Sequence, residues 1–195
     1  MKLLFASSNV NKLIEIRNLL PKGYNLLSLK DLDFYDELEE STATLEGNAL
    51  QKASFVYHKF KTNCFADDSG LEVEALKGKP GVHSAYYAGL PRNDSKNISQ
   101  VLLELGNVEN RSARFRTVIA LIFDGKEILF EGILNGDIAL APAGTHGFGY
   151  DPIFIPEGFK ETLACMTLEA KILISHRSKA IQQLIAHLSS LKPGY

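Results

Sequence analysis

Two adjacent carboxylates, Asp67 and Asp68, follow an apolar run and precede Ser69 and Gly70. Adjacent carboxylates at the end of a strand are costly unless they meet a cation. Because side chains alternate along a strand, one carboxylate would face a cleft while the other turned away or capped the turn. Mg²⁺ prefers one or two carboxylates together with waters and substrate phosphates, so the pair indicates a magnesium site that orients a water. A plain Asp-Ser-Gly turn is the alternative.

An acidic stretch lies upstream of this pair and contains Asp36, Glu37, Glu39 and Glu40. Carboxylates are good ligands for Mg²⁺, so this stretch could supply a second ligand to the same metal. Taken alone, the stretch fits a solvated acidic loop better.

Cations stand where two helices are predicted to begin. Lys12 lies in the first turn of one helix. Ser175 is a good N-cap for the other, and His176, Arg177 and Lys179 crowd the turn behind it. A cation in a first turn opposes the helix dipole unless an anion occupies the site, and a polyphosphate would relieve both helix starts. The alternatives are a solvated Lys12 behind an Asn or Ser cap, and side chains of the second cluster that extend into water.

The run from Gly147 to Pro152 predicts a compact loop rich in glycine and aromatic residues. Glycines permit close backbone approach, and Phe148 or Tyr150 could stack on a nucleotide base while Asp151 accepts hydrogen bonds. A tight turn with core aromatics is the alternative. The sequence contains no Walker motif, no dinucleotide-binding fingerprint and no Cys/His metal pattern.

The elements that must position these residues alternate between strand and helix early in the chain. Asp-Gly at residues 124–125, between apolar runs, predicts a hairpin later on. Together the patterns indicate an α/β fold with a mixed sheet. The predicted strands cover residues 2–6, 63–66, 114–123, 127–133 and 153–155, and the predicted helices cover 12–20, 45–60, 98–105 and a last segment that begins at Ser175.

The composition is that of an ordinary globular protein. The 195 residues predict one domain, or one domain with two lobes, and the net charge of −2 argues weakly against a nucleic-acid or membrane surface. Cys64 and Cys165 form neither a disulfide framework nor a metal-ligand spacing. The apolar start is too short for a signal peptide, and no apolar run is long enough for a membrane helix. We therefore expect a cytoplasmic protein.

Taken together, these segments closely resemble the inosine triphosphate pyrophosphatase family, the non-standard purine NTP (dITP/XTP) pyrophosphatases. The match extends over nearly the whole chain, and several weak motifs in the correct order make it specific. Its anchors are residues 7–12 (SSNVNK), Asn48-Ala49, residues 66–71 (ADDSGL), residues 80–85 (PGVHSA), residues 147–154 (GFGYDPIF) and residues 174–177 (ISHR).

The resemblance implies a fold and an assembly. The fold would be α/β with a twisted mixed sheet flanked by helices. It would form a single nucleotide pyrophosphatase domain over residues 1–195, elongated and two-lobed with a central cleft. The assembly would be a homodimer.

The resemblance also implies a role for each site residue. Asp68 would be the catalytic general base and a Mg²⁺ ligand, with Glu39, by its offset from Asn48, as the other ligand. The remaining residues would bind substrate: Ser7, Ser8, Asn9, Val10, Asn11 and Lys12 at the triphosphate, Ser69 against the substrate, and Phe148, Gly149, Tyr150, Asp151, Lys171, His176 and Arg177 around the base and ribose. The chain departs from the family pattern at Gly47, Tyr86, Cys165 and Ile172, none of which carries an assigned role.

The implied reaction converts ITP, dITP or XTP and water into the monophosphate and pyrophosphate, which cleanses the nucleotide pool. Water would attack the α-phosphorus, while Lys12, the loop amides and Mg²⁺ stabilise charge on the leaving group. Donors from Lys171, Arg177 or backbone N–H groups would suit the 6-oxo group of hypoxanthine and xanthine, and the amino group of adenine would leave them unpaired. Guanine shares the 6-oxo group, so its 2-amino group must be rejected.

Three other functions are weighed against this one. A pyrophosphatase for modified pyrimidines would differ in its base preference. A nucleotide sensor without turnover would not need Asp68, so the acidic pair argues against it. A phosphatase with Asp67 as nucleophile is disfavoured, because the Asp-x-Asp arrangement common in that chemistry is absent.

Overall fold

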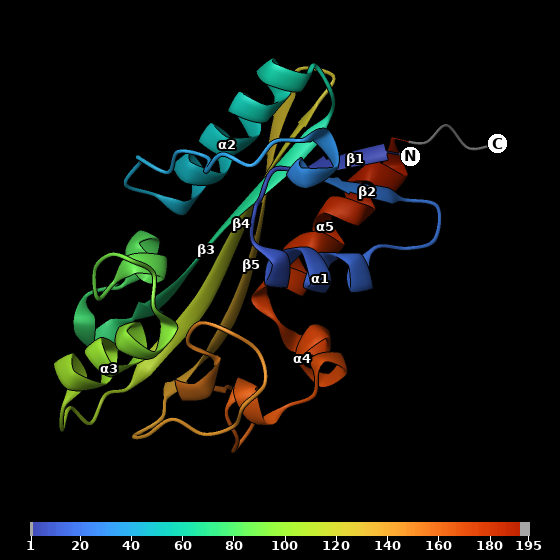
Figure 1. Ribbon diagram of the computed structural model, residues 1–195. Helices are drawn as coiled ribbons and strands as arrows, with labels where there is room; N and C mark the ends of the chain where they lie inside the picture. Colours follow the sequence, from blue (N-terminus) through green and yellow to red (C-terminus); the bar gives the residue numbers. More distant parts are fainter. Residues whose placement is uncertain (1, 192–195) are drawn as a thin grey trace. The chain divides into compact units, whose positions relative to one another are not determined.

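The computed structural model describes residues 2–191, whose strands form a six-stranded sheet in the order β2-β1-β3-β4-β5-β6. Strands β1 to β5 are labelled in Figure 1. Parallel pairs join β1 to β2 and β1 to β3, whereas β5 and β6 are antiparallel, so the sheet is mixed as predicted. The strands are β1 Lys2–Phe5, β2 Asn25–Ser28, β3 Cys64–Val73, β4 Ser112–Phe123, β5 Lys126–Ile138 and β6 Phe154–Pro156. The helices are α1 Val10–Leu19, α2 Leu45–Phe60, α3 Asp94–Leu105, α4 Leu168–Ile174 and α5 His176–Ser190.

Short 3-10 turns lie between these elements, at Leu29–Leu32, Glu74–Leu76, Gly81–Tyr86, Asp151–Ile153 and Leu163–Cys165. The chain divides into two compact units: unit 1 comprises residues 1–68, 117–132 and 177–195, and unit 2 comprises residues 69–116 and 133–176. Strands β3, β4 and β5 each contribute residues to both units.

The core of unit 1 follows from strand alternation. Phe65 of β3 packs in a cluster with Ile16 of α1 and Leu184 of α5, while the thiol of its neighbour Cys64 donates to the carbonyl of Ala53 in α2. Successive side chains of a strand point to opposite faces of the sheet. Helices α1 and α5 therefore cover one face of this part of the sheet, and α2 covers the other (Figure 1).

The core of unit 2 gathers apolar side chains around helix α3. Ile98, Val101 and Leu105 follow helical spacing and pack against Phe115 of β4 and Phe154 of β6. Asn93 caps this helix by accepting from the N–H of Lys96 at 2.9 Å. Asn93 therefore sets where α3 begins.

The predicted hairpin is confirmed: Asp124 and Gly125, with φ of 50° and 78°, connect β4 to its neighbour β5. Helix α2 has the predicted bounds, whereas α3 begins four residues earlier than expected, because Asn93 provides the cap. The strand predicted to end at Ala66 instead continues to Val73 as β3, since buried cations neutralise its two aspartates. Strand β2 and helix α4 were not predicted.

Over residues 2–191, no helix is both long enough and apolar enough to cross a bilayer.

Candidate active site

Asp67 is a buried anion held between two cations of unit 1. Its side chain is fully buried, and its carboxylate lies 3.1 Å from Lys12 Nζ and 3.2 Å from Arg177 Nε. Burial by itself would raise the pKa of Asp67, but the attraction of Lys12, Arg177 and Lys52 outweighs it and holds the pKa below its usual range. Asp67 is therefore a fixed negative charge that orients these cations.

The two helix starts meet internal anions rather than water. Asn9 caps α1 by accepting from the N–H of Lys12, yet the Lys12 side chain is only 13% exposed because it bends onto Asp67. Arg177, only 1% exposed, pairs with Asp67 and also with Glu15 of α1. The solvated alternative is therefore wrong for both side chains.

Asp68 faces a different set of partners, as strand alternation predicts. Its Oδ2 accepts from the side-chain amide of Asn48 at 3.0 Å, and its Oδ1 lies 3.8 Å from Lys52 Nζ. The ammonium of Lys52 also donates to the carbonyl of Asp67 at 2.8 Å. The plain Asp-Ser-Gly turn is therefore wrong: these residues continue β3, and helix α2 holds the second carboxylate.

The surroundings of Asp68 make it more basic than an ordinary aspartate. Burial raises its pKa most, Glu40 adds to the rise, and Lys52 and Lys12 oppose it. The net direction is upward, whereas that of Asp67 is downward. A carboxylate with a raised pKa is better suited to accept a proton from water, so Asp68 is the candidate general base of the pair.

The acidic stretch delivers Glu40 to this cluster. Glu40 forms an ion pair with Lys52 and is one of the charges that act on Asp68. Glu39, the residue expected as second metal ligand, is exposed, and its role stays a prediction. Across residues 2–191, no group of three acidic, histidine or cysteine side chains is arranged to hold a metal. Mg²⁺ needs only one or two carboxylates, so Asp68 and Glu40 still fit this ion.

Two residues of this cluster escaped the sequence analysis. Lys52 lies on the buried stripe of α2 with Ala49, Ala53 and Val56, so a lysine on the apolar face of a predicted helix was the available signal. Glu15 lies beside Ile16 in α1, but its partner Arg177 is far away in sequence. No local pattern shows such a pairing.

The turn before α2 explains one departure from the family pattern. Thr42 donates its N–H and its hydroxyl to Oδ1 of Asn48, which orients the amide that reaches Asp68. A Cβ on Gly47 would lie 2.4 Å from the Thr42 hydroxyl oxygen and 2.8 Å from its Cβ. A larger residue at position 47 would therefore displace Thr42.

The segment expected to hold the triphosphate runs from the end of β1 into α1. Ser7 and Asn9 are half-buried, whereas Ser8, Val10 and Asn11 are exposed. The Ser7 hydroxyl accepts from the N–H of Asn9 at 3.2 Å. The segment thus presents exposed residues at a capped helix start, with Lys12 beneath it, as an anion site requires.

The glycine and aromatic loop of unit 2 is organised by Asp151. Its Oδ2 accepts from the N–H of Phe148 at 2.9 Å and from Lys171 Nζ at 2.7 Å. The same ammonium lies 4.7 Å from the centre of the Phe148 ring. Gly147 has φ of +77°, and a Cβ there would lie 2.1 Å from the Asp151 carboxylate. The resemblance placed Phe148, Asp151 and Lys171 at one site, and the structure brings these three side chains together.

Other expected base-pocket residues of unit 2 are buried. Tyr150 is 4% exposed and donates its hydroxyl to the carbonyl of Ser84 at 2.9 Å, which fits the core-aromatic alternative. The His176 ring stacks on Phe115, with centres 4.7 Å apart. Ser69 is half-buried in β3. Contact of these residues with a nucleotide stays a prediction.

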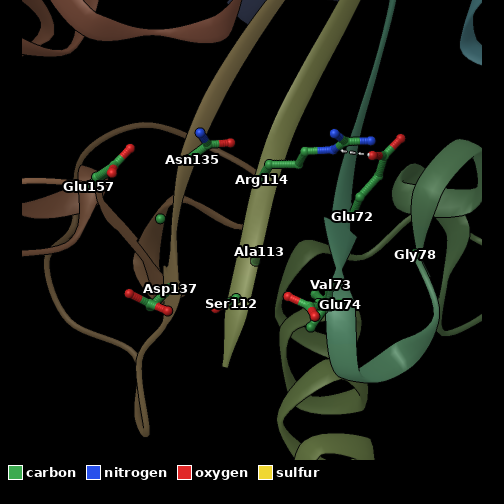
Figure 2. A pocket seen from close by; sticks show the side chains of 11 residues that line it. Glu72, Val73, Glu74, Gly78, Ser112, Ala113, Arg114, Asn135, Asp137 and Glu157 are labelled. Carbon is green, nitrogen blue, oxygen red and sulfur yellow. Dashed lines mark hydrogen bonds and ion pairs between the residues drawn. The ribbon is translucent and has the colours of Figure 1, made fainter. Parts of the chain in front are cut away.

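A separate hollow of about 480 Å³ lies on unit 2 (Figure 2). Glu72 of β3 and Arg114 of β4 line this hollow, point toward one another and form an ion pair (Figure 2). Its other polar lining residues include Asn135, Asp137 and Glu157. None of the residues expected from the sequence lines this hollow. It does not support the chemistry predicted above.

Comparison with known proteins agrees over nearly the full chain. Residues 3–187 match the model of the Ham1 family. The dITP/XTP pyrophosphatase of Flavobacterium johnsoniae is 50% identical over 192 residues, covering 98% of this chain and 100% of that protein. The dITP/XTP pyrophosphatase of Bacillus subtilis is 43% identical over 185 residues, 93% of each. The Staphylococcus aureus Ham1 protein has a similar structure, with a TM-score of 0.90, 38% identity, and coverage of 98% of this chain and 100% of that one.

Proposed function

Because this chain belongs to the Ham1 family, we propose that it hydrolyses the non-standard purine nucleotides dITP, ITP and XTP to the monophosphate and pyrophosphate. The observation that carries the proposal is the buried Asp68, fixed by Asn48 and Lys52 and made more basic by its surroundings. A binding protein without turnover has no need of such a carboxylate.

The residues of unit 1 support the phosphate chemistry. Lys12, oriented by Asp67, would bind the polyphosphate, and backbone N–H groups at the start of α1 would add to its hold. Asp68 would orient a water and take its proton as the water attacks the α-phosphorus. Lys52 would stabilise the ionised form of Asp68 and limit its pKa.

Magnesium is part of this proposal because hard carboxylate oxygens form the donor set. Asp68 would hold the ion, and either Glu39, as the resemblance implies, or Glu40, which acts on Asp68, would be the second ligand. When bound, Mg²⁺ supplies positive charge that stabilises the leaving pyrophosphate.

The base would be recognised by residues of unit 2. Phe148 provides an aromatic face and Lys171 a buried donor beside it, which suit a purine with a 6-oxo acceptor. Arg177, expected at the base, has carboxylate partners in unit 1, so its contribution to base selection rests on the resemblance alone. The proposed homodimer also rests on the resemblance alone, and the proposed cytoplasmic location rests on the sequence alone.

A base panel tests the proposal. The purified protein with Mg²⁺ should release pyrophosphate from ITP, dITP and XTP, and much less from ATP, GTP and dUTP. Pyrophosphate and orthophosphate are assayed separately, because IDP with orthophosphate would identify a phosphatase. A preference for a pyrimidine would favour the alternative family of pyrophosphatases.

A further inference from the structure

One side chain of helix α3 contacts the glycine and aromatic loop of residues 147–152. Asp94, the first residue of this helix, accepts the backbone N–H of Gly149 on its Oδ2 at 2.8 Å. Its other oxygen accepts from Arg92 Nε at 3.1 Å. Sequence reasoning had no signal for this contact, because the two partners are 55 residues apart and an acidic residue in a first turn is ordinary.

The contact is one of several attachments of the loop within unit 2. Tyr150 is attached to the Ser84 carbonyl, Asp151 to Lys171 of α4, and Gly149 to Asp94 of α3. Gly149 has φ of +62°, a conformation that glycine adopts at no steric cost but does not hold by itself. A hydrogen bond to an ionised carboxylate is about twice as strong as one between neutral groups, so it can fix this backbone.

We infer that Asp94 is a positioning residue that fixes the backbone of the Phe148–Gly149 segment in the conformation that receives the purine base. The attachment point is itself held in place, since Ile98 and Val101 anchor α3 in the core of unit 2. This inference rests on the proposed function for its substrate, though not for the contact itself.

The consequence for catalysis is specific. Asp94 holds the loop that carries Phe148 and leaves the phosphate and water chemistry of unit 1 untouched. Loss of the contact should therefore weaken binding of the base and spare the chemical step. Removal of one charge-assisted hydrogen bond predicts a rise of about tenfold or more in KM for ITP, with kcat changed by less than about threefold.

The test uses Asp94→Ala and a matched control, Asn93→Ala. The control removes the adjacent cap of the same helix, which destabilises α3 without touching Gly149. Three quantities are measured for each variant: kcat and KM for ITP with Mg²⁺, and the exchange rate of the Gly149 amide proton by NMR. We expect Asp94→Ala to raise KM and speed Gly149 exchange about tenfold or more, while Asn93→Ala does neither to that extent.

The possible results distinguish failure of the positioning role of Asp94 from failure of the proposed function. Unchanged Gly149 exchange in Asp94→Ala, or an equal change in Asn93→Ala, would overturn the positioning role. A lower KM in Asp94→Ala would also overturn it, because Asp94 would then compete with the base for the Gly149 N–H. If the parent protein hydrolyses no purine triphosphate, the proposed function fails, yet Gly149 exchange still reports whether Asp94 fixes the loop.

Discussion

The neighbouring residues Asp67 and Asp68 have different proposed roles because different charges surround their carboxylates. The attraction of Lys12 and Arg177 outweighs the burial of Asp67 and holds its pKa down. Burial raises the pKa of Asp68, which has a more distant ammonium and a nearby Glu40 that adds to the rise. One carboxylate thus organises cations and the other is suited to take a proton. The sequence predicted that the two side chains would point in different directions, but not which cations would serve Asp67. The role of Asp68 as base comes from the resemblance and stays a prediction.

The substitution Asp68→Asn tests the base. It keeps the size of the side chain but replaces one acceptor oxygen with a donor, and it removes the basicity of the group and one charge from the metal site. General base catalysis contributes about a hundredfold to ten-thousandfold, so we expect a loss of kcat on that scale. ITP binding, measured by calorimetry, should change much less. A variant with the turnover of the parent would exclude Asp68 from this role.

The variants Glu40→Gln and Glu39→Gln decide between the two neighbouring acids. Because Glu40 reaches Lys52 and acts on Asp68, its loss should raise the Mg²⁺ concentration for half-maximal activity about tenfold or more. Glu39→Gln is the matched control and should stay within about threefold. If Glu39→Gln instead raises this Mg²⁺ concentration more than Glu40→Gln does, the second metal ligand is Glu39, as its offset from Asn48 in the family pattern implies.

At the scale of elements, buried charges connect three segments of unit 1. Arg177 at the start of α5 pairs with Glu15 of α1 and Asp67 of β3. Removal of one partner from a buried ionic group leaves the others uncompensated. Lys12 and Arg177, the cations at two helix starts where the sequence indicates a bound anion, thus also connect elements of unit 1.

The substitution Arg177→Ala should therefore reduce the free energy of unfolding by about 3–5 kcal/mol, measured by urea denaturation. Arg114→Ala is the control: its partner Glu72 is also a carboxylate, but the Arg114 side chain is 49% exposed, so the loss should be about 1 kcal/mol or less. Equal losses in the two variants would mean that the buried network contributes no special stability.

Local patterns predicted most elements, and the misses have physical causes. Helix α2 and the hairpin were predictable because spacing and turn chemistry are local. The full length of β3 was not, because two aspartates in a strand need cations from α1, α2 and α5 that only the fold supplies. The contacts of Lys52, Glu15 and Asp94 were missed for the same reason.

At the scale of the whole molecule, the chain forms two compact units, each with its own core and its own candidate site residues. Unit 1 holds the acidic pair with its cations, and unit 2 holds the glycine and aromatic loop. Composition could not place this division of the chain, because β3, β4 and β5 each belong to both units. The single domain with two lobes stays a prediction. The central cleft stays a prediction.

The most direct test of the central claim follows the oxygen of the attacking water. The protein hydrolyses ITP with Mg²⁺ in water enriched in ¹⁸O, and mass spectrometry locates the label in the separated products. Because Asp68 is proposed to direct water at the α-phosphorus, the label should appear in IMP and be absent from pyrophosphate. Label in pyrophosphate would place the attack on the β-phosphorus, and label in orthophosphate with IDP as co-product would contradict the account altogether.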